Sequence, residues 1–104
     1  MAGPYEVEFL ISAARELEGL PPDAQRRVID SISALAAEPR PAGAMLLSGT
    51  GRDRIWRIRV GAYRVLYQVE DARITVIIVR VADRREVYNQ AAVKRLLGRL
   101  RGLP

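Results

Sequence analysis

The chain has 104 residues, of which 49% are hydrophobic and 28% charged, as expected for one folded domain that buries its own core. It contains no cysteine and no histidine, which excludes disulfides, thiolate metal sites and catalysis by a histidine base. The net charge is +5 and the isoelectric point is about 10.4.

The positive charge is concentrated in the second half of the chain. Residues 1–54 carry 6 basic and 8 acidic side chains, whereas residues 55–104 carry 11 basic and 4 acidic ones. A basic half favours a polyanionic partner, with a merely solvated basic surface as the alternative. No apolar run approaches the ~20 residues of a membrane span, and the N-terminus does not resemble a secretory signal. We therefore expect a cytoplasmic protein with no membrane contact.

The first forty residues predict a strand followed by two helices. Apolar and acidic side chains alternate over residues 5–9, as in a half-buried strand. Apolar positions then recur at helical spacing over residues 11–20 and again over 23–37, before Pro39 and Pro41 stop the second helix. We expect these two helices to form a hairpin that lies on a sheet.

The rest of the chain predicts a meander of strands and a closing helix. The expected elements are a short strand at 45–47, three strands at 55–60, 63–70 and 73–82, and a helix at 89–100. Gly61-Ala62 and Asp71-Ala72 each suit a two-residue hairpin turn. The predicted fold class is α+β: one domain over residues 1–104, with an N-terminal strand and a helix hairpin packed on an antiparallel sheet, and a C-terminal helix.

The register that these two turns impose gives the sheet one apolar side. In the first hairpin Trp56 pairs with Tyr67 and Ile58 with Val65; in the second, Val65 pairs with Ile78 and Tyr67 with Val76. We expect this side to pack against three residues of the second helix. These are Ile29, Ile32 and Leu35.

The same register gathers Arg57, Arg59 and Arg64 on the face away from the helices. Like charges that face each other destabilise a sheet, so the arrangement suits an anion that arrives from outside. Arg84, Arg85 and Tyr88 follow the last strand and could close over the same place. Guanidinium groups bind phosphate oxygens in a bidentate way, and an aromatic ring can stack on an unpaired base. The pattern therefore predicts an RNA or phosphate site.

In order and spacing, these segments resemble the RelE/ParE superfamily of toxins from toxin–antitoxin systems. The resemblance covers residues 4–97. The segments that carry it are YEVEF (5–9), LP (20–21), PRP (39–41), WRIRV (56–60), YRVLY (63–67) and RVADRREVY (80–88).

The resemblance implies a RelE-type messenger RNA interferase, which cleaves mRNA in the ribosomal A site without a metal or other cofactor. It implies catalytic roles for Arg64, Arg84 and Tyr88, with Arg85 able to replace Arg84 if the loop is shifted by one residue. Arg57, Arg59 and Arg85 would bind RNA or its phosphates. Well-studied relatives carry lysines where this chain has Arg57 and Arg59, so the identity of the general base stays open.

The resemblance also implies three partners, namely the ribosome, mRNA and a cognate antitoxin of RelB-like or other type. The residues expected to bind the antitoxin are Arg84, Arg85, Lys94, Arg95 and Arg99. Two alternatives remain. One is a ParE-type toxin, which shares the fold and inhibits DNA gyrase; the other is a non-catalytic basic binding module.

Overall fold

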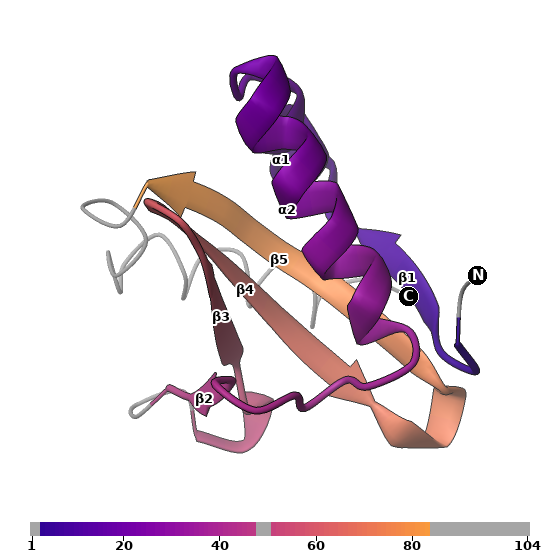
Figure 1. Cartoon of the computed structure of the whole chain (residues 1–104). Coiled ribbons are helices and arrows are strands. Elements are labelled where there is room, and N and C mark those ends of the chain that lie inside the picture. Colours follow the sequence, from indigo (N-terminus) through magenta and orange to yellow (C-terminus); the bar gives the residue numbers. More distant parts are fainter. Residues whose placement is uncertain (1–2, 48–50, 84–104) are drawn as a thin grey trace.

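The computed structural model describes residues 3–47 and 51–83, where two helices lie on one face of a five-stranded sheet (Figure 1). The elements are β1 (Glu6–Phe9), α1 (Ile11–Glu18), α2 (Pro22–Leu35), β2 (Met45–Leu46), β3 (Trp56–Val60), β4 (Tyr63–Glu70) and β5 (Thr75–Asp83), with short 3-10 helices η1 (Gly51–Asp53) and η2 (Asp71–Arg73). Every element expected in these ranges is present. The predicted helix at 89–100 lies outside the described residues.

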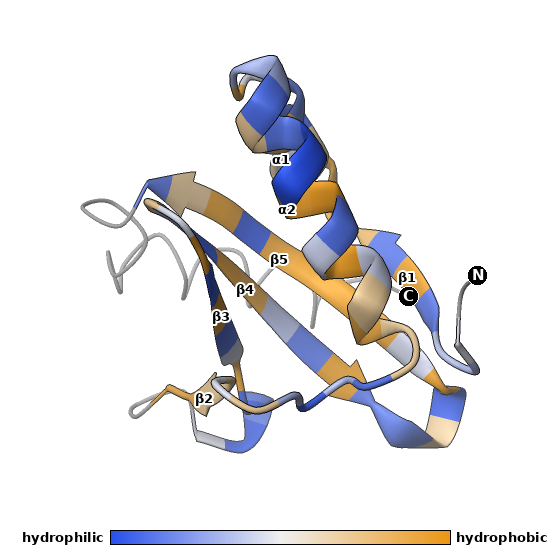
Figure 2. Cartoon of the chain, in the orientation of Figure 1, coloured by the Kyte–Doolittle hydropathy of each residue, from blue (hydrophilic) through white to orange (hydrophobic). Residues whose placement is uncertain are grey.

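The second helix shows how sequence spacing selects the buried face. It begins at Pro22, whose fixed φ suits a first helical turn. Val28, Ile32 and Leu35 lie one turn apart and are all buried, at 3% exposure or less. The expectation that Ile29 is buried is wrong, because its side chain is 44% exposed. Ile29 directly follows Val28 on the helix, so it points to one side of the buried face that Val28, Ile32 and Leu35 form. Figure 2 shows the resulting mixture of hydrophobic and hydrophilic residues along α2 beside a mainly hydrophobic β5.

The sheet has the strand order β1-β5-β4-β3-β2. Neighbours from β5 to β2 are antiparallel, but β1 runs parallel to β5, with Val7 opposite Val76. The predicted α+β fold with its antiparallel meander is confirmed, and the parallel strand β1 makes the sheet as a whole mixed. The strands that precede and follow the helix hairpin, β1 and β2, run in opposite directions, and the three antiparallel pairings from β2 to β5 then bring β5 into the direction of β1.

The first hairpin has the predicted register. Trp56 pairs with Tyr67, and Ile58 with Val65. The turn is Gly61-Ala62, and Gly61 has a φ of +60°. A positive φ at the first central residue alone is the pattern of a type II′ turn, which matches the twist of the strands.

The second hairpin departs from the predicted register. Tyr67 pairs with Ile78, and Val65 with Val81. Two features cause the shift. The connection is the 3-10 turn η2 followed by Ile74 in a left-handed conformation, and the ladder has a bulge that leaves Val79 without a partner. A bulge adds one residue to one strand, so residues before and after it obey different pairings.

The core lies mainly between the helices and the sheet. Val65, Tyr67, Val76 and Ile78 are fully buried there, as predicted, while Trp56 is only half-buried. A second, smaller cluster comes from alternate residues of the same strands. Its buried members are Ile55, Leu66, Val79 and Ala82. The face away from the helices is thus partly apolar, and its arginines border this second cluster.

Candidate functional site

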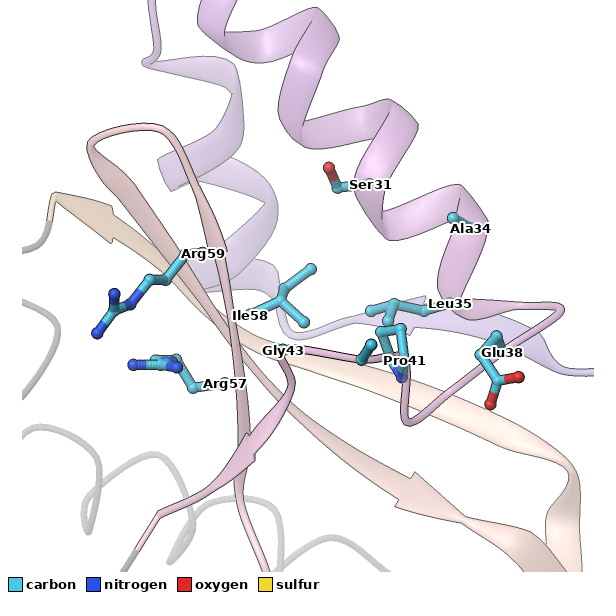
Figure 3. Close-up of a pocket in the computed structure, with 10 residues that line it drawn as sticks. Ser31, Ala34, Leu35, Glu38, Pro41, Gly43, Arg57, Ile58 and Arg59 are labelled. Carbon is cyan, nitrogen blue, oxygen red and sulfur yellow. The ribbon is translucent and has the colours of Figure 1, made fainter.

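Three arginines of the first hairpin share the face of the sheet that is turned away from the helices. Arg59 pairs directly with Arg64, and Arg57 is two residues before Arg59 on β3. Figure 3 shows the side chains of Arg57 and Arg59 pointing away from α2, on the opposite side of β3 from Ile58. The grouping predicted for these three residues is therefore present.

Their surroundings differ. Arg57 is 5% exposed, Arg59 is exposed and Arg64 is half-buried. The Nη1 of Arg64 donates hydrogen bonds to the carbonyl oxygens of Gly61, at 3.2 Å, and Tyr63, at 3.1 Å. These bonds hold one edge of the Arg64 guanidinium against the hairpin turn and leave its remaining donors for another acceptor.

The other predicted site residues lie outside the described part of the chain. They are Arg84, Arg85 and Tyr88, together with the residues expected to bind an antitoxin, Lys94, Arg95 and Arg99. Their roles remain predictions.

The structure adds Arg80 to this face, a residue that was not among those predicted for the site. Beyond the bulge Arg80 pairs with Leu66, a member of the second apolar cluster. Its side chain is 12% exposed, and its Nε lies 3.4 Å from Oε2 of Glu16 on α1. An arginine inside an otherwise apolar strand was the one signal in the sequence that could have drawn attention to it.

A groove of about 450 Å³ lies on the other side of β3. It is bordered by Leu35 and Glu38 at the end of α2, by Gly43 in the following connection and by β3 itself (Figure 3). Arg57 and Arg59 belong to its wall, but their side chains leave in the opposite direction. The groove and the arginine face are therefore two separate features.

Tyr5 and Tyr67, two of the described tyrosines, are poor candidates for a catalytic base. Tyr67 is fully buried and donates a hydrogen bond of 2.7 Å to the carbonyl oxygen of Pro39, and burial raises its pKa to about 12. Tyr5 donates to Asp71, and this bond raises the pKa of its hydroxyl. Both phenols stay protonated near neutral pH. As predicted, Tyr67 serves packing rather than chemistry.

Among the described residues there is no group of three acidic side chains that could hold a metal ion. The same residues include no helix long and apolar enough to span a membrane. The chemistry that the described face can offer is that of clustered guanidinium groups, which bind and stabilise phosphate charge.

Comparisons with known proteins agree on one family. Residues 7–88 match the sequence model of the family described as "ParE toxin of type II toxin-antitoxin system, parDE". The chain is 36% identical over 91 residues to Toxin RelG of Mycobacterium tuberculosis, an alignment that covers 84% of this chain and 99% of that one.

Solved structures show the same fold. One is the toxin–antitoxin complex RelBE2 from Mycobacterium tuberculosis, with a TM-score of 0.69 and 32% identity over 83% of this chain and 98% of that one. Another is the archaeal RelE–RelB complex from Pyrococcus horikoshii, with a TM-score of 0.70 and 29% identity over 81% and 99%.

Proposed function

Since this chain belongs to the RelE/ParE superfamily and is a toxin of the type II toxin–antitoxin class, we propose that it is an endoribonuclease that cleaves mRNA in the ribosomal A site. The observation that carries the proposal is the pair formed by Arg59 and Arg64, with Arg57 beside it, on the face away from the helices. Three guanidinium groups on one sheet face favour a ligand rich in phosphate.

The proposed reaction needs no metal. The ribose 2′-oxygen attacks the adjacent phosphorus while its proton passes to a base, and the bond from phosphorus to the 5′-oxygen breaks. The 5′-oxygen takes up a proton, and the products are a 2′,3′-cyclic phosphate and a 5′-hydroxyl. Arg64 and Arg84 would stabilise the charge that builds up on the phosphorane, because fixed donors aimed at developing charge lower the barrier.

Tyr88 would act on the 2′-hydroxyl or stack on the nucleotide. Nearby positive charge favours a phenolate, which would make Tyr88 a competent base. Arg57 and Arg59 would neutralise phosphates along the bound strand, since an arginine does not readily lose its proton. Arg85 lies next to Arg84 in the sequence and is the alternative for its role.

We further propose that the chain has a cognate antitoxin. Two similar solved structures are complexes of a RelE-type toxin with its antitoxin. The basic residues after β5 would supply the contact with a complementary acidic partner. They are Arg84, Arg85, Lys94, Arg95 and Arg99. Association that slows as salt concentration rises is the expected sign of such a contact.

The second candidate is inhibition of DNA gyrase. The match to a family described as ParE toxin favours it, because that description names the other functional branch of the superfamily. The two candidates predict different damage in the cell, since an interferase cuts mRNA whereas a gyrase poison breaks DNA.

The test is to express the full chain without an antitoxin and analyse both nucleic acids. Cleaved mRNA with 2′,3′-cyclic phosphate ends, and intact DNA, is the expected result. Cleavage should be reproduced on purified ribosomes programmed with mRNA and should be weak on free RNA. Broken DNA with intact mRNA would replace the proposal with the gyrase candidate.

A further inference from the structure

Arg80 is a charged residue in β5, the most deeply buried of the described strands. Its neighbours on β5, Val79 and Val81, are at most 1% exposed, and its own side chain is 12% exposed. Arginine is almost never buried to this extent unless charged or polar partners surround its guanidinium. The contacts that Arg80 makes are therefore informative.

The β-bulge determines which face Arg80 occupies. Leu66 pairs with Arg80 whereas Tyr67 pairs with Ile78, so Val79 is the extra residue. Paired residues in a ladder share a face, which puts Arg80 on the same side as Leu66. The next pair on that side is Arg64 with Ala82. Arg64 and Arg80 are thus diagonal neighbours on one face, a separation that long side chains bridge.

The guanidinium of Arg80 is only partly satisfied. Its Nε lies 3.4 Å from Glu16 Oε2 without forming a hydrogen bond. Its Nε and Nη1 are enclosed and have no hydrogen-bond acceptor, and the same is true of Nε of Arg64. Buried donors in native proteins are normally paired, so donors without an acceptor indicate a ligand that supplies one. Two such arginines at diagonal positions of one sheet face are within reach of a common anion.

Glu16, the acidic residue of α1 that lies next to Arg80, is itself fixed by a hydrogen bond. Its Oε1 accepts a hydrogen bond of 2.9 Å from the backbone N–H of Val81. The partner strand β1 pairs with β5 only as far as Ile78, so the carboxylate occupies the edge of β5 that β1 leaves open. A carboxylate fixed in this way orients Arg80 without satisfying all its donors.

We propose that Arg80 is a further phosphate-binding residue of the arginine face, that it shares one phosphate with Arg64, and that Glu16 is its positioning residue. The inference deepens the proposed function and rests on it for the source of the phosphate, which would be the RNA backbone. The contact is one of binding and charge stabilisation, and no bond is made or broken by Arg80.

The first experiment uses inorganic phosphate as the probe and needs no catalytic activity. Side-chain Nε–Hε resonances of arginine are followed by NMR while phosphate is titrated into the full chain at constant ionic strength. We expect the resonances of Arg64 and Arg80 to shift together with one midpoint, while that of Arg73, in the turn η2 before β5, does not move. A shift of Arg64 without Arg80, or no shift of either, overturns the proposal.

The second experiment measures single-turnover cleavage of mRNA on programmed ribosomes by three variants, each of which replaces one charged residue with neutral glutamine. Arg80→Gln should lower the cleavage rate at least ~10-fold, because one preorganised donor to the phosphate is lost. Glu16→Gln keeps an acceptor for the Val81 N–H but removes the negative charge that orients Arg80, so it should also lower the cleavage rate, by less than Arg80→Gln does. Arg73→Gln is the matched control for loss of one positive charge and should be unchanged.

Folding is checked by thermal unfolding of each variant, and Arg80→Lys keeps the charge if Arg80→Gln does not fold. If Arg80 served structure alone, Arg80→Gln and Glu16→Gln would both lower Tm but would both cut at the wild-type rate at temperatures where they are folded, which overturns the proposal. Wild-type protein that fails to cut mRNA on ribosomes would overturn the proposed function instead. The phosphate titration would then still decide whether Arg64 and Arg80 share an anion.

Discussion

Arg59 and Arg64 face each other directly across the β3–β4 ladder, so two like charges occupy one antiparallel pair. Such a pair is unfavourable for folding, and opposite charges in its place contribute roughly 0.2–1 kcal/mol. The presence of the Arg59–Arg64 pair therefore indicates a role other than stability. In the proposed function this role is to bind a phosphate that neutralises both residues.

The first prediction is therefore a trade between stability and activity. Arg59→Glu should raise the free energy of unfolding by roughly 0.2–1 kcal/mol, because it converts repulsion with Arg64 into attraction. The same change should abolish mRNA cleavage by repelling phosphate. Urea unfolding with linear extrapolation measures the first effect, and ribosome-dependent cleavage measures the second. Arg59→Gln is the control that removes repulsion without adding attraction. A less stable but fully active Arg59→Glu would contradict both expectations.

The second prediction concerns catalysis by Arg64. Its guanidinium is fixed at one edge by the carbonyl groups of Gly61 and Tyr63, so it is preorganised for a bound phosphate. Removing one such donor typically costs ~10²–10³ in rate. We expect Arg64→Ala to show that loss in single-turnover cleavage, measured under conditions where urea unfolding shows the variant to be folded. If Arg64→Ala and Tyr88→Phe both cut at the wild-type rate, the site assignment is wrong and the gyrase candidate gains support.

The first hairpin was predictable in full because its register depends on local sequence. The two-residue turn Gly61-Ala62 determines which residues pair across the hairpin. The alternation of side chains along the strands then places Ile58 and Val65 in the core and Arg57 and Arg59 on the other face. Within a tight hairpin a slip of one residue would bury arginines, so only one register is consistent with the pattern.

The second hairpin was not predictable because its register depends on two features without a clear local signal. Ile74 adopts a φ of +49°, which is uncommon for a β-branched residue and which no sequence rule assigns. The bulge residue Val79 is fully buried in the second apolar cluster, so its position depends on tertiary packing. Both effects are tertiary, and together they move Arg80 onto the arginine face. The parallel pairing of β1 was missed for a similar reason, since it depends on where the helix hairpin leads the chain.

The third prediction tests the turn that sets this register. Gly61 has a φ of +60°, and a Cβ at this position would meet only Arg27 Nη1, at an ordinary 3.7 Å. The cost of Gly61→Ala is therefore that of the left-handed backbone, about 1–2 kcal/mol of unfolding free energy. Gly19→Ala is the matched control, because Gly19 has a φ of −79° and similar space. Equal effects of the two substitutions in urea unfolding would contradict the turn geometry.

The last prediction concerns alkaline pH and Tyr67. Burial raises the pKa of its hydroxyl from 10.0 to about 12, so the folded protein keeps this proton at a pH where the unfolded chain releases it. The stabilising contribution is complete below pH 10 and is lost between pH 10 and 12, at about 1.4 kcal/mol per pH unit.

Tyr67→Phe has no hydroxyl to ionise, so it does not lose this stability at alkaline pH. It also lacks the hydrogen bond to the Pro39 carbonyl, and the absence of that bond lowers its stability by about 1 kcal/mol at neutral pH. The variant should therefore be less stable than wild type at pH 7 and at least as stable at pH 12, as measured by urea unfolding across that range. Tyr5, whose pKa is also raised, contributes equally to both proteins and cancels in the comparison. A constant difference between the two proteins from pH 7 to pH 12 would show that Tyr67 ionises as freely when folded as when unfolded.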